Sequence, residues 1–326
     1  MDRAPYQLAL QVGVVGALLI CVALTPILST FGSSSPHVVA PPLPLIPSAQ
    51  FCLVIVSMLG GIVYPWSCFL LDTWNPFGWL LTFVFEDSSR WHLVSYWIVC
   101  LVIFIPASAA VSRLLALRQI IARKLFHLLV LIMFVPAFFI DSDMLALSYG
   151  VAFAAFCLVE CVRAVSLPPI GHSIAVFVRP FIDHREGGRV ILTHTYLLLG
   201  CALPIWLAPS SSASFALAAN AGVIVLGVGD AMGAVVGSTY GKRKLFGSKT
   251  LEGTAAVLVS TLVASLALHY VDLTSVSISD TITSPVIMLA FGATLSSTLE
   301  AATAQIDNLI LSLFAYAMAN LTVCHA

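Results

Sequence analysis

A glycine-rich polar stretch holds the densest set of reactive side chains in this sequence: residues 229–254, GDAMGAVVGSTYGKRKLFGSKTLEGT. It contains Gly233, Gly237 and Gly241 at four-residue spacing, followed by four Lys and Arg side chains. Glycine lets the backbone approach a ligand closely, and backbone N–H groups in a turn surround phosphate oxygens. Lysine adds point charges that pair with phosphate. The stretch therefore predicts a binding site for a nucleotide triphosphate.

Two carboxylates in this stretch give it a second kind of chemistry. Asp230 and Glu252 could hold Mg²⁺ or another divalent metal, with phosphate oxygens completing the coordination. The residues expected to contact the nucleotide share a small, hydroxyl-bearing or cationic side chain. They are Gly233, Gly237, Ser238, Gly241, Lys242, Lys244, Ser248, Lys249, Thr250 and Gly253. An alternative stays open, in which the spaced glycines pack helices together and the basic residues only fix topology or contact anionic lipid.

Familiar nucleotide-binding motifs do not account for this stretch. GSTYGKRK has three residues between its glycines where a Walker A loop has four, and no Ser or Thr follows Lys242. GVGDAMG, which starts at Gly227, misses the G-x-G-x-x-G spacing. The sequence thus excludes a P-loop and a dinucleotide-binding loop.

Two further clusters place polar side chains beside apolar segments. RKLFH, at 123–127, puts Arg123 and His127 on one helical face, where they could reach an anionic group. TLEAATAQIDNL, at 298–309, puts Glu300 and Asp307 on one face two turns apart, as a second candidate metal site. The alternatives are basic side chains that snorkel to the interface and ordinary polar helix ends.

Ionisable residues also occur within apolar runs, where burial is costly and a function is the default hypothesis. Glu160 lies one turn before Arg163, and the alternative to a function is a structural ion pair. His194 lies in another apolar run, where it could form a hydrogen bond between helices. Residues 183–186 are interpreted as a solvated turn.

An almost wholly apolar chain must position these residues. Of its 326 residues, 60% are hydrophobic and 9% are charged, the mean hydropathy is +1.03 and the net charge is −1. A soluble domain carries about 25% charged residues. The composition therefore excludes a soluble fold and indicates an all-α, polytopic bundle of roughly nine or ten transmembrane helices. Apolar runs of membrane length lie at 8–31, 51–71, 91–112, 125–140, 144–165, 190–209, 213–229, 254–271, 283–300 and 306–323.

Basic residues mark one side of this predicted bundle. From Arg113 onward, twelve of the fourteen Lys and Arg lie at one set of helix ends, whereas the alternate loops hold only acids such as Asp141. The positive-inside rule places the basic ends in the cytosol. Residues 229–254, Glu300 and Asp307 are then expected at the cytosolic side, near one depth.

The remaining features concern the division of the chain. Residues 1–74 are interpreted as N-terminal spans with a Ser- and Pro-rich linker at 32–50, and residues 75–326 as the catalytic transmembrane domain. The first run is expected to be a retained signal-anchor, because its apolar part is too long for a cleaved signal peptide. The eight cysteines show no zinc-type spacing and are expected to be packing residues.

In their order along the chain, five blocks resemble the dolichol kinase family of CTP-dependent polyprenol kinases. The blocks are RKLFH with a following VP at 123–136, FCLVECVR at 156–163, LTHTYLLLGCALPIWL at 192–207, the stretch at 229–254, and EAATAQIDNLIL at 300–311. The resemblance covers about residue 75 to the C-terminus. The glycine-rich block is shared with phytol kinases and CTP-dependent diacylglycerol kinases, whereas the LTHTY block is typical of dolichol kinases.

The resemblance implies a multi-pass enzyme of the endoplasmic reticulum membrane, with its active site facing the cytosol. Such an enzyme moves the γ-phosphate of CTP to the terminal hydroxyl of dolichol, and the dolichyl phosphate serves protein glycosylation. The implied partners are dolichol and membrane lipids, with no nucleic acid.

The resemblance also implies roles for individual residues. Asp230, Lys249 and Glu252 match the acidic and basic positions that are important in the family's CTP-binding loop. The divalent metal would lie on Asp230 together with Glu252 or Asp307. A carboxylate or His127 would accept the proton of the alcohol.

Two departures and several alternatives stay open. Ser248 stands where family members often carry a second lysine, and those members often have more N-terminal spans. A CTP-dependent kinase for diacylglycerol or phytol, or a CDP-lipid synthase, would share the glycine-rich block. The non-enzymatic alternatives are a membrane transporter, which is expected to place charges near the bilayer midplane, and an inactive shortened relative.

Overall fold

A computed structural model describes residues 4–33, 35–182, 186–208, 215–245, 247, 249–275, 283–302 and 308–321. Within these residues every secondary-structure element is a helix, apart from an isolated β-bridge between Lys244 and Thr250. The all-α fold predicted from composition is therefore confirmed.

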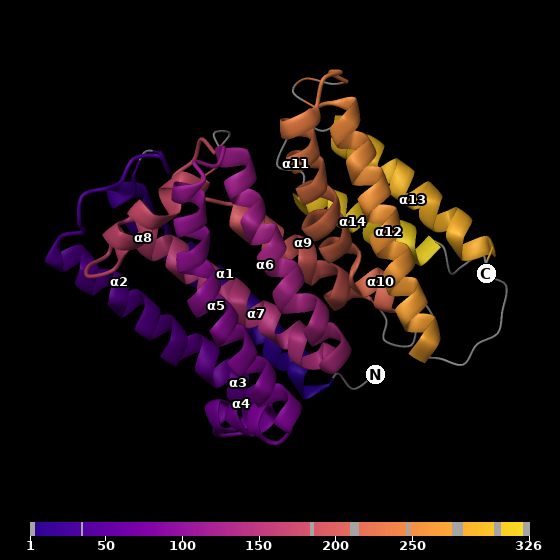
Figure 1. Cartoon of the computed structure of the whole chain (residues 1–326). Helices are drawn as coiled ribbons and strands as arrows, with labels where there is room; N and C mark the ends of the chain where they lie inside the picture. The colour runs from indigo at the N-terminus through magenta and orange to yellow at the C-terminus, as the bar shows by residue number, and fades with distance from the viewer. Residues whose placement is uncertain are drawn as a thin grey trace. The chain divides into compact units, whose positions relative to one another are not determined.

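The helices follow one another along the chain as Figure 1 labels them. The α-helices are α1 Pro5–Phe31, α2 Leu45–Met58, α3 Tyr64–Leu70, α4 Pro76–Phe85, α5 Ser88–Leu114, α6 Gln119–Ile140, α7 Ser142–Ala164, α8 Gly171–Val178, α9 Thr193–Leu207, α10 Phe215–Ala219, α11 Ala231–Tyr240, α12 Leu251–Ser275, α13 Thr283–Ala302 and α14 Asn308–Leu321. Two π-helices, η1 (Leu59–Val63) and η3 (Val223–Asp230), and one 3₁₀-helix, η2 (Arg179–Phe181), interrupt or extend them.

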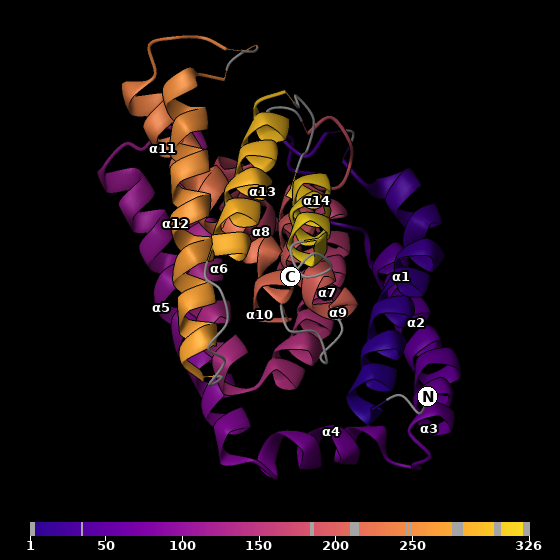
Figure 2. The ribbon, with the colours of Figure 1, turned by 90° about the vertical axis from the view of Figure 1, so that its right-hand side faces the viewer.

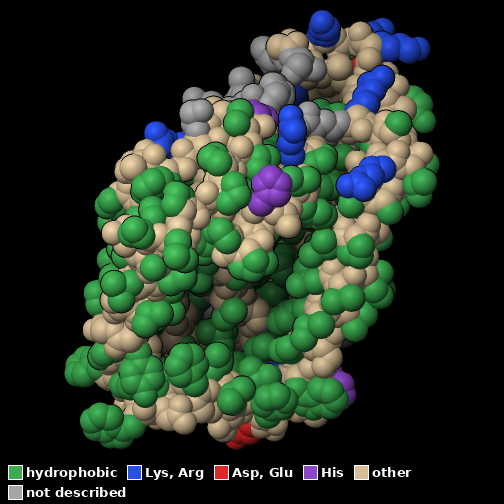
Figure 3. Space-filling view, turned by 90° about the vertical axis from the view of Figure 1, so that its left-hand side faces the viewer, with side chains coloured by type: hydrophobic (Ala, Val, Ile, Leu, Met, Phe, Trp, Pro, Cys, Tyr) green, Lys and Arg blue, Asp and Glu red, His purple; other side chains and the backbone are tan. Residues whose placement is uncertain are grey.

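Seven helical segments of the described chain are long and apolar enough to cross a membrane. They are Pro5–Phe31, Leu45–Leu70, Ser88–Leu114, Ile120–Ile140, Ser142–Ala164, Val223–Tyr240 and Leu251–Val271. Hydrophobic side chains cover most of the face that Figure 3 shows, as expected where helices meet lipid tails. The chain is a multi-pass membrane protein.

One predicted span ends in the wrong place. The run at 213–229 was expected to stop where the polar stretch begins, but η3 continues directly into α11 and the helical segment ends at Tyr240. Residues 231–240, AMGAVVGSTY, contain neither proline nor a charged side chain, so nothing in them stops a helix. Asp230 consequently lies in the middle of a helical segment.

By packing, the chain divides into two units. Unit 1 comprises Met1–Val99 and Ala137–Leu198, and unit 2 comprises Cys100–Pro136 and Leu199–Ala326. The predicted division after residue 74 concerns which part carries the catalytic function, and it stays a prediction.

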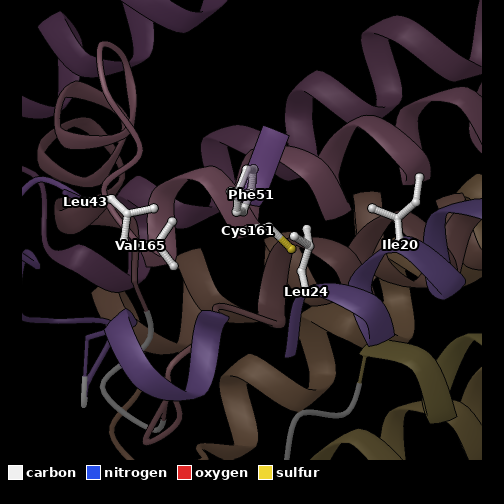
Figure 4. Close-up of a cluster of buried hydrophobic side chains, with 6 residues drawn as sticks. All are labelled: Ile20, Leu24, Leu43, Phe51, Cys161 and Val165. Carbon is white, nitrogen blue, oxygen red and sulfur yellow. The ribbon is translucent and has the colours of Figure 1, made fainter. Parts of the chain in front are cut away.

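Unit 1 is built on the contact between α1 and α7, with α2 against α1 and α8 against α7. Asp141 caps α7 by accepting the Met144 N–H at 2.8 Å, and the same carboxylate pairs with Arg90 at 2.7 Å. A Cβ at Gly150 would lie 2.3 Å from Leu10 Cδ1, so glycine allows α1 to pack closely on α7. Figure 4 shows the core of this unit, formed by Ile20, Leu24, Leu43, Phe51, Cys161 and Val165.

Unit 2 contains the helices that carry the polar stretch at 229–254 and the helices that pack against them. α12 contacts η3, α10, α11 and α13, and α14 contacts α10, α13 and η3. Figure 1 and Figure 2 both show α11, α12 and α13 side by side. The side chains of Leu226 on η3, Val257 on α12 and Leu311 on α14 are almost completely buried. The polar residues of this unit are therefore held by an apolar helical scaffold.

Candidate functional site

A buried cluster of one acid and two bases lies in unit 2. Lys124 Nζ on α6 donates a hydrogen bond to Oδ2 of Asp230, the last residue of η3. His127 Nε2 is 3.1 Å from the same oxygen and 3.5 Å from Lys124 Nζ. The side chains of Lys124, His127 and Asp230 are 7%, 6% and 13% exposed. Removing charges from water this far is costly, and this cluster offsets part of that cost by pairing them.

Local sequence explains how these residues meet. Lys124 and His127 are three residues apart and so lie on one face of α6. A Cβ at Gly227 would lie 2.9 Å from Leu131 Cδ2, so this glycine lets η3 approach α6. η3 itself is π-helical, and single π-helical turns often occur at functional sites.

Two features of this cluster differ from the sequence analysis. His127 was expected to act with Arg123, but the structure pairs it with Lys124 and Asp230. Lys124 is one of the twelve basic residues that the sequence analysis used only to orient the helices in the membrane. Its three-residue spacing from His127 was the available signal. His127 Nδ1 is buried and has no hydrogen-bond partner among the described residues.

A second ion pair lies in the same unit. Lys249 Nζ, just before α12, donates to Oε1 of Glu300 on α13. The Glu300 side chain is 5% exposed and that of Lys249 is 34% exposed. Two residues proposed separately from sequence are thus brought together. Asp307 and Ser248, which were predicted to act beside them, lie outside the described residues.

The basic part of the polar stretch forms a tight turn that Glu252 fastens. The Glu252 carboxylate accepts the Lys242 N–H at 3.1 Å and the Arg243 N–H at 3.2 Å. Backbone hydrogen bonds from Leu251 to Arg243 and from Leu245 to Lys249, at 2.8 and 2.9 Å, close the turn. The side chains of residues 242–245 are exposed. Cations are therefore presented to water from an ordered backbone.

The glycines of this stretch have a different role from the one predicted. Gly233 and Gly237 lie within α11, so they do not form a phosphate-binding turn. A Cβ at Gly233 would lie 2.4 Å from Val257 Cγ2, and one at Gly253 would lie 3.0 Å from the Gly233 carbonyl oxygen. The structure thus has the alternative arrangement, in which small residues let two helices, α11 and α12, pack closely. Gly241 ends α11, where a Cβ would lie 2.6 Å from Thr250 Oγ1.

The described chain does not bring together Asp230 and Glu252, which were predicted to share a metal. Asp230 precedes α11, whereas Glu252 bonds the residues that follow it, so the two carboxylates are separated by the ten-residue helix, about 15 Å long. No group of three or more His, Cys, Asp or Glu suited to a metal occurs among the described residues. Asp230 is also already paired with Lys124. The described residues therefore do not place these two carboxylates where they could share one metal ion.

The remaining candidates lie in unit 1. Glu160 and Arg163 form a double hydrogen bond of 2.6 and 2.8 Å, and Glu160 also accepts the Ile191 N–H. The contact is the structural ion pair that the sequence left open as the alternative to a functional role for Glu160. Glu186 was interpreted as part of a solvated turn, but its side chain is buried and accepts the N–H groups of Leu192 and Thr193. His194 lies half-buried in the first turn of α9.

Comparisons with known proteins agree on one family. Residues 2–258 match the family model described as Dolichol kinase. The chain is 34% identical to Dolichol kinase EVAN of Arabidopsis thaliana over 278 residues, which cover 83% of this chain and 48% of that protein. It is 34% identical to the Dolichol kinase of Homo sapiens over 282 residues, covering 82% and 51%, and 30% identical to that of Saccharomyces cerevisiae over 247 residues, covering 75% and 45%.

Three further facts belong with these comparisons. The chain spans about half the length of the curated relatives it matches. No solved structure matches it. The family match begins at residue 2, so it includes the region 1–74 that the sequence motifs had left outside the resemblance.

Proposed function

Because the chain belongs to the dolichol kinase family, we propose that it transfers the γ-phosphate of CTP to the terminal hydroxyl of dolichol. The observation that carries the proposal is the buried Lys124–His127–Asp230 cluster, which lies in the same unit as the exposed basic turn. Ionisable residues inside a membrane segment are functional candidates by default. A charged nucleotide and a lipid alcohol need such a combination of basic surface and apolar helices.

The proposed reaction exchanges one phosphorus–oxygen bond for another. A bond forms between the alcohol oxygen of dolichol and the γ-phosphorus of CTP. The bond from that phosphorus to the oxygen bridging to the β-phosphate breaks, and CDP leaves with this oxygen. The alcohol proton passes to a base of the protein. Catalysis of this class depends on positioning and on neutralising charge.

We assign the end of CTP that carries the cytidine and the α-phosphate to the basic turn, so that the triphosphate extends along α11 toward the His127–Asp230 pair. Lys242, Arg243 and Lys244 expose their side chains on a backbone that Glu252 holds in place. Arg118 donates to the Ser238 carbonyl oxygen at 2.9 Å, which places a further cation at the last turn of α11. Lysine and arginine are the usual partners of phosphate.

We assign the proton to the His127–Asp230 pair. A neutral imidazole that donates from Nε2 to Asp230 keeps a lone pair on Nδ1. That nitrogen has no hydrogen-bond partner in the described part of the chain. Lys124 would stabilise the Asp230 carboxylate while the imidazole becomes charged. No step is assigned to a metal, because the described carboxylates do not form the predicted site.

The membrane placement is also part of the proposal. The basic turn and the other basic helix ends favour the cytosolic side by the positive-inside rule. The family and the multi-pass helices support the endoplasmic reticulum membrane as the location. In this arrangement CTP arrives from the cytosol and dolichol from the bilayer.

The test uses the full chain, purified in detergent, with dolichol, Mg²⁺ and γ-³²P-CTP. Label is expected in a lipid monophosphate, with CDP released, and it should be lost in Asp230→Asn. Asp141→Asn, which removes a carboxylate of similar exposure that pairs with Arg90 in unit 1, serves as the matched control and should retain label.

Other products would contradict the proposal in different ways. Label in diacylglycerol but not in dolichol would assign another lipid alcohol as substrate. A CDP-lipid with released pyrophosphate would identify cytidylyl transfer. Equal label from ATP would contradict the choice of CTP.

A further inference from the structure

A half-open apolar cavity of about 40 Å³ lies in unit 2 between η3, α12, α13 and α14. Small residues of α13, Gly292 and Ala293, form part of its wall, and Ile224 of η3 forms another part. A cavity of this size has room for a few heavy atoms, such as the polar end of a longer ligand. Neither the mechanism above nor the sequence motifs use this cavity.

The polar groups on its wall are hydroxyls. Thr261 and Ser265 are one turn apart on α12, and Ser296 faces them from α13. The described lining contains no charged side chain. A phosphate would lose its hydration there without gaining a cation, which is unfavourable. The chemistry suits an apolar ligand with one uncharged polar end.

Thr261 gives the cavity a specific point of attachment. It is 4% exposed, and its Oγ1 is a buried atom with no hydrogen-bond partner among the described residues. Such an unpaired hydroxyl is uncommon in a native protein and reduces stability unless a ligand or water satisfies it. A hydroxyl-bearing ligand would do so as donor or acceptor.

Two residues of the cavity wall, Thr261 and Ser296, lie next to the helical turns that carry Asp230 and Glu300. A Cβ at Gly229 would lie 2.5 Å from Thr261 Oγ1, so this hydroxyl contacts the residue that directly precedes Asp230. On α13, Ser296 lies four residues before Glu300, which is one helical turn or about 6 Å. A ligand with its polar end at Thr261 therefore lies next to the helical turn that carries Asp230.

From these observations we infer that the cavity binds the hydroxyl end of an isoprenoid alcohol. Thr261 Oγ1 hydrogen-bonds to the terminal hydroxyl, and the walls of α13 and η3 contact the carbon that bears it. The inference rests on the proposed function for the identity of the alcohol. It makes Thr261 and Ser265 substrate-binding residues and does not assign them a chemical step.

Kinetics on the full chain test the inference through two matched pairs. Thr261→Val removes the hydroxyl and keeps the shape, and we expect KM for dolichol to rise about threefold to tenfold, while KM for CTP is unchanged. Ser260→Ala is the control, because its hydroxyl bonds its own helix at Val257 O, at 3.2 Å. Ser265→Leu fills the cavity, whereas Ala267→Leu adds the same volume at an exposed position of α12. Equal dolichol KM values within both pairs would overturn the inference.

A binding measurement separates this inference from the proposed function. A diazirine-bearing short-chain isoprenoid alcohol is photolysed with the full chain in detergent, without nucleotide, and the labelled residues are mapped by mass spectrometry. Label is expected at 261–265 and 292–296 and should be reduced in Ser265→Leu but not in Ala267→Leu. Label elsewhere only would overturn the cavity assignment even in an active kinase. Label at these positions in a chain without kinase activity would support the cavity while refuting the proposed function.

Discussion

Lys124 and Asp230 are 106 positions apart in the sequence and form a buried ion pair between α6 and η3. His127 completes the cluster from the same helix as Lys124. This contact joins the RKLFH segment to the polar stretch at 229–254, which the sequence presents as separate features. The cluster has consequences for stability as well as for catalysis.

Breaking the ion pair from one side is expected to destabilise the protein. Lys124→Met leaves the Asp230 carboxylate buried without its cation, which should lower the free energy of unfolding by about 3–5 kcal/mol. Adding Asp230→Asn removes the stranded charge and should restore most of that loss, without restoring kinase activity. Unfolding in detergent by denaturant titration measures both variants. Lys242→Met, at an exposed position, should change the value by less than about 0.5 kcal/mol. Additive effects of the two buried substitutions would show that the pair is not coupled.

Replacing His127 should affect turnover more than binding. His127→Gln removes the proposed proton acceptor, so kcat should fall by about 10²- to 10⁴-fold while KM for CTP changes little. Initial rates with γ-³²P-CTP at saturating dolichol give both parameters. His172→Gln, at an exposed position of α8, is the control and should keep the wild-type kcat. A rise in KM with unchanged kcat would instead make His127 a binding residue.

Glu252 should act on the nucleotide through the backbone of the basic turn. Glu252→Ala removes the acceptor for the N–H groups of Lys242 and Arg243, and KM for CTP should rise about tenfold. Glu252→Gln keeps an acceptor oxygen and should have a smaller effect. The Mg²⁺ concentration for half-maximal activity should stay the same in both, because the Glu252 carboxylate accepts backbone N–H groups of the basic turn. A shift in that concentration would return Glu252 to the role of metal ligand.

The close packing of α11 on α12 should not tolerate a side chain at Gly253. A Cβ there meets the Gly233 carbonyl oxygen at 3.0 Å and Gly237 Cα at 3.1 Å, both of them backbone atoms. Gly253→Leu should lower the free energy of unfolding by about 1–3 kcal/mol, measured by denaturant titration in detergent. Ala255→Leu, exposed on the same helix, should have little effect. Equal stability of the two variants would contradict the packing role of these glycines.

Much of the fold followed from hydrophobic length alone, because a bilayer requires long apolar helices and most of the predicted runs are such helices. The end of the run at 213–229 was misjudged, since glycines and small residues were taken as a turn when α12 packs against them as a helix. Glycine permits both conformations, and only its neighbours in space select one.

The membrane class, the family and the polar residues available for chemistry can be recognised from the amino-acid sequence, because composition, block order and residue type are properties of the chain. Which of those residues meet depends on the folded structure. It joined Lys124 to Asp230 and Lys249 to Glu300, and it separated Asp230 from Glu252 by the length of α11. The physical reason is that contacts between distant segments depend on helix packing, and packing is set by the combined shapes of side chains on several helices at once.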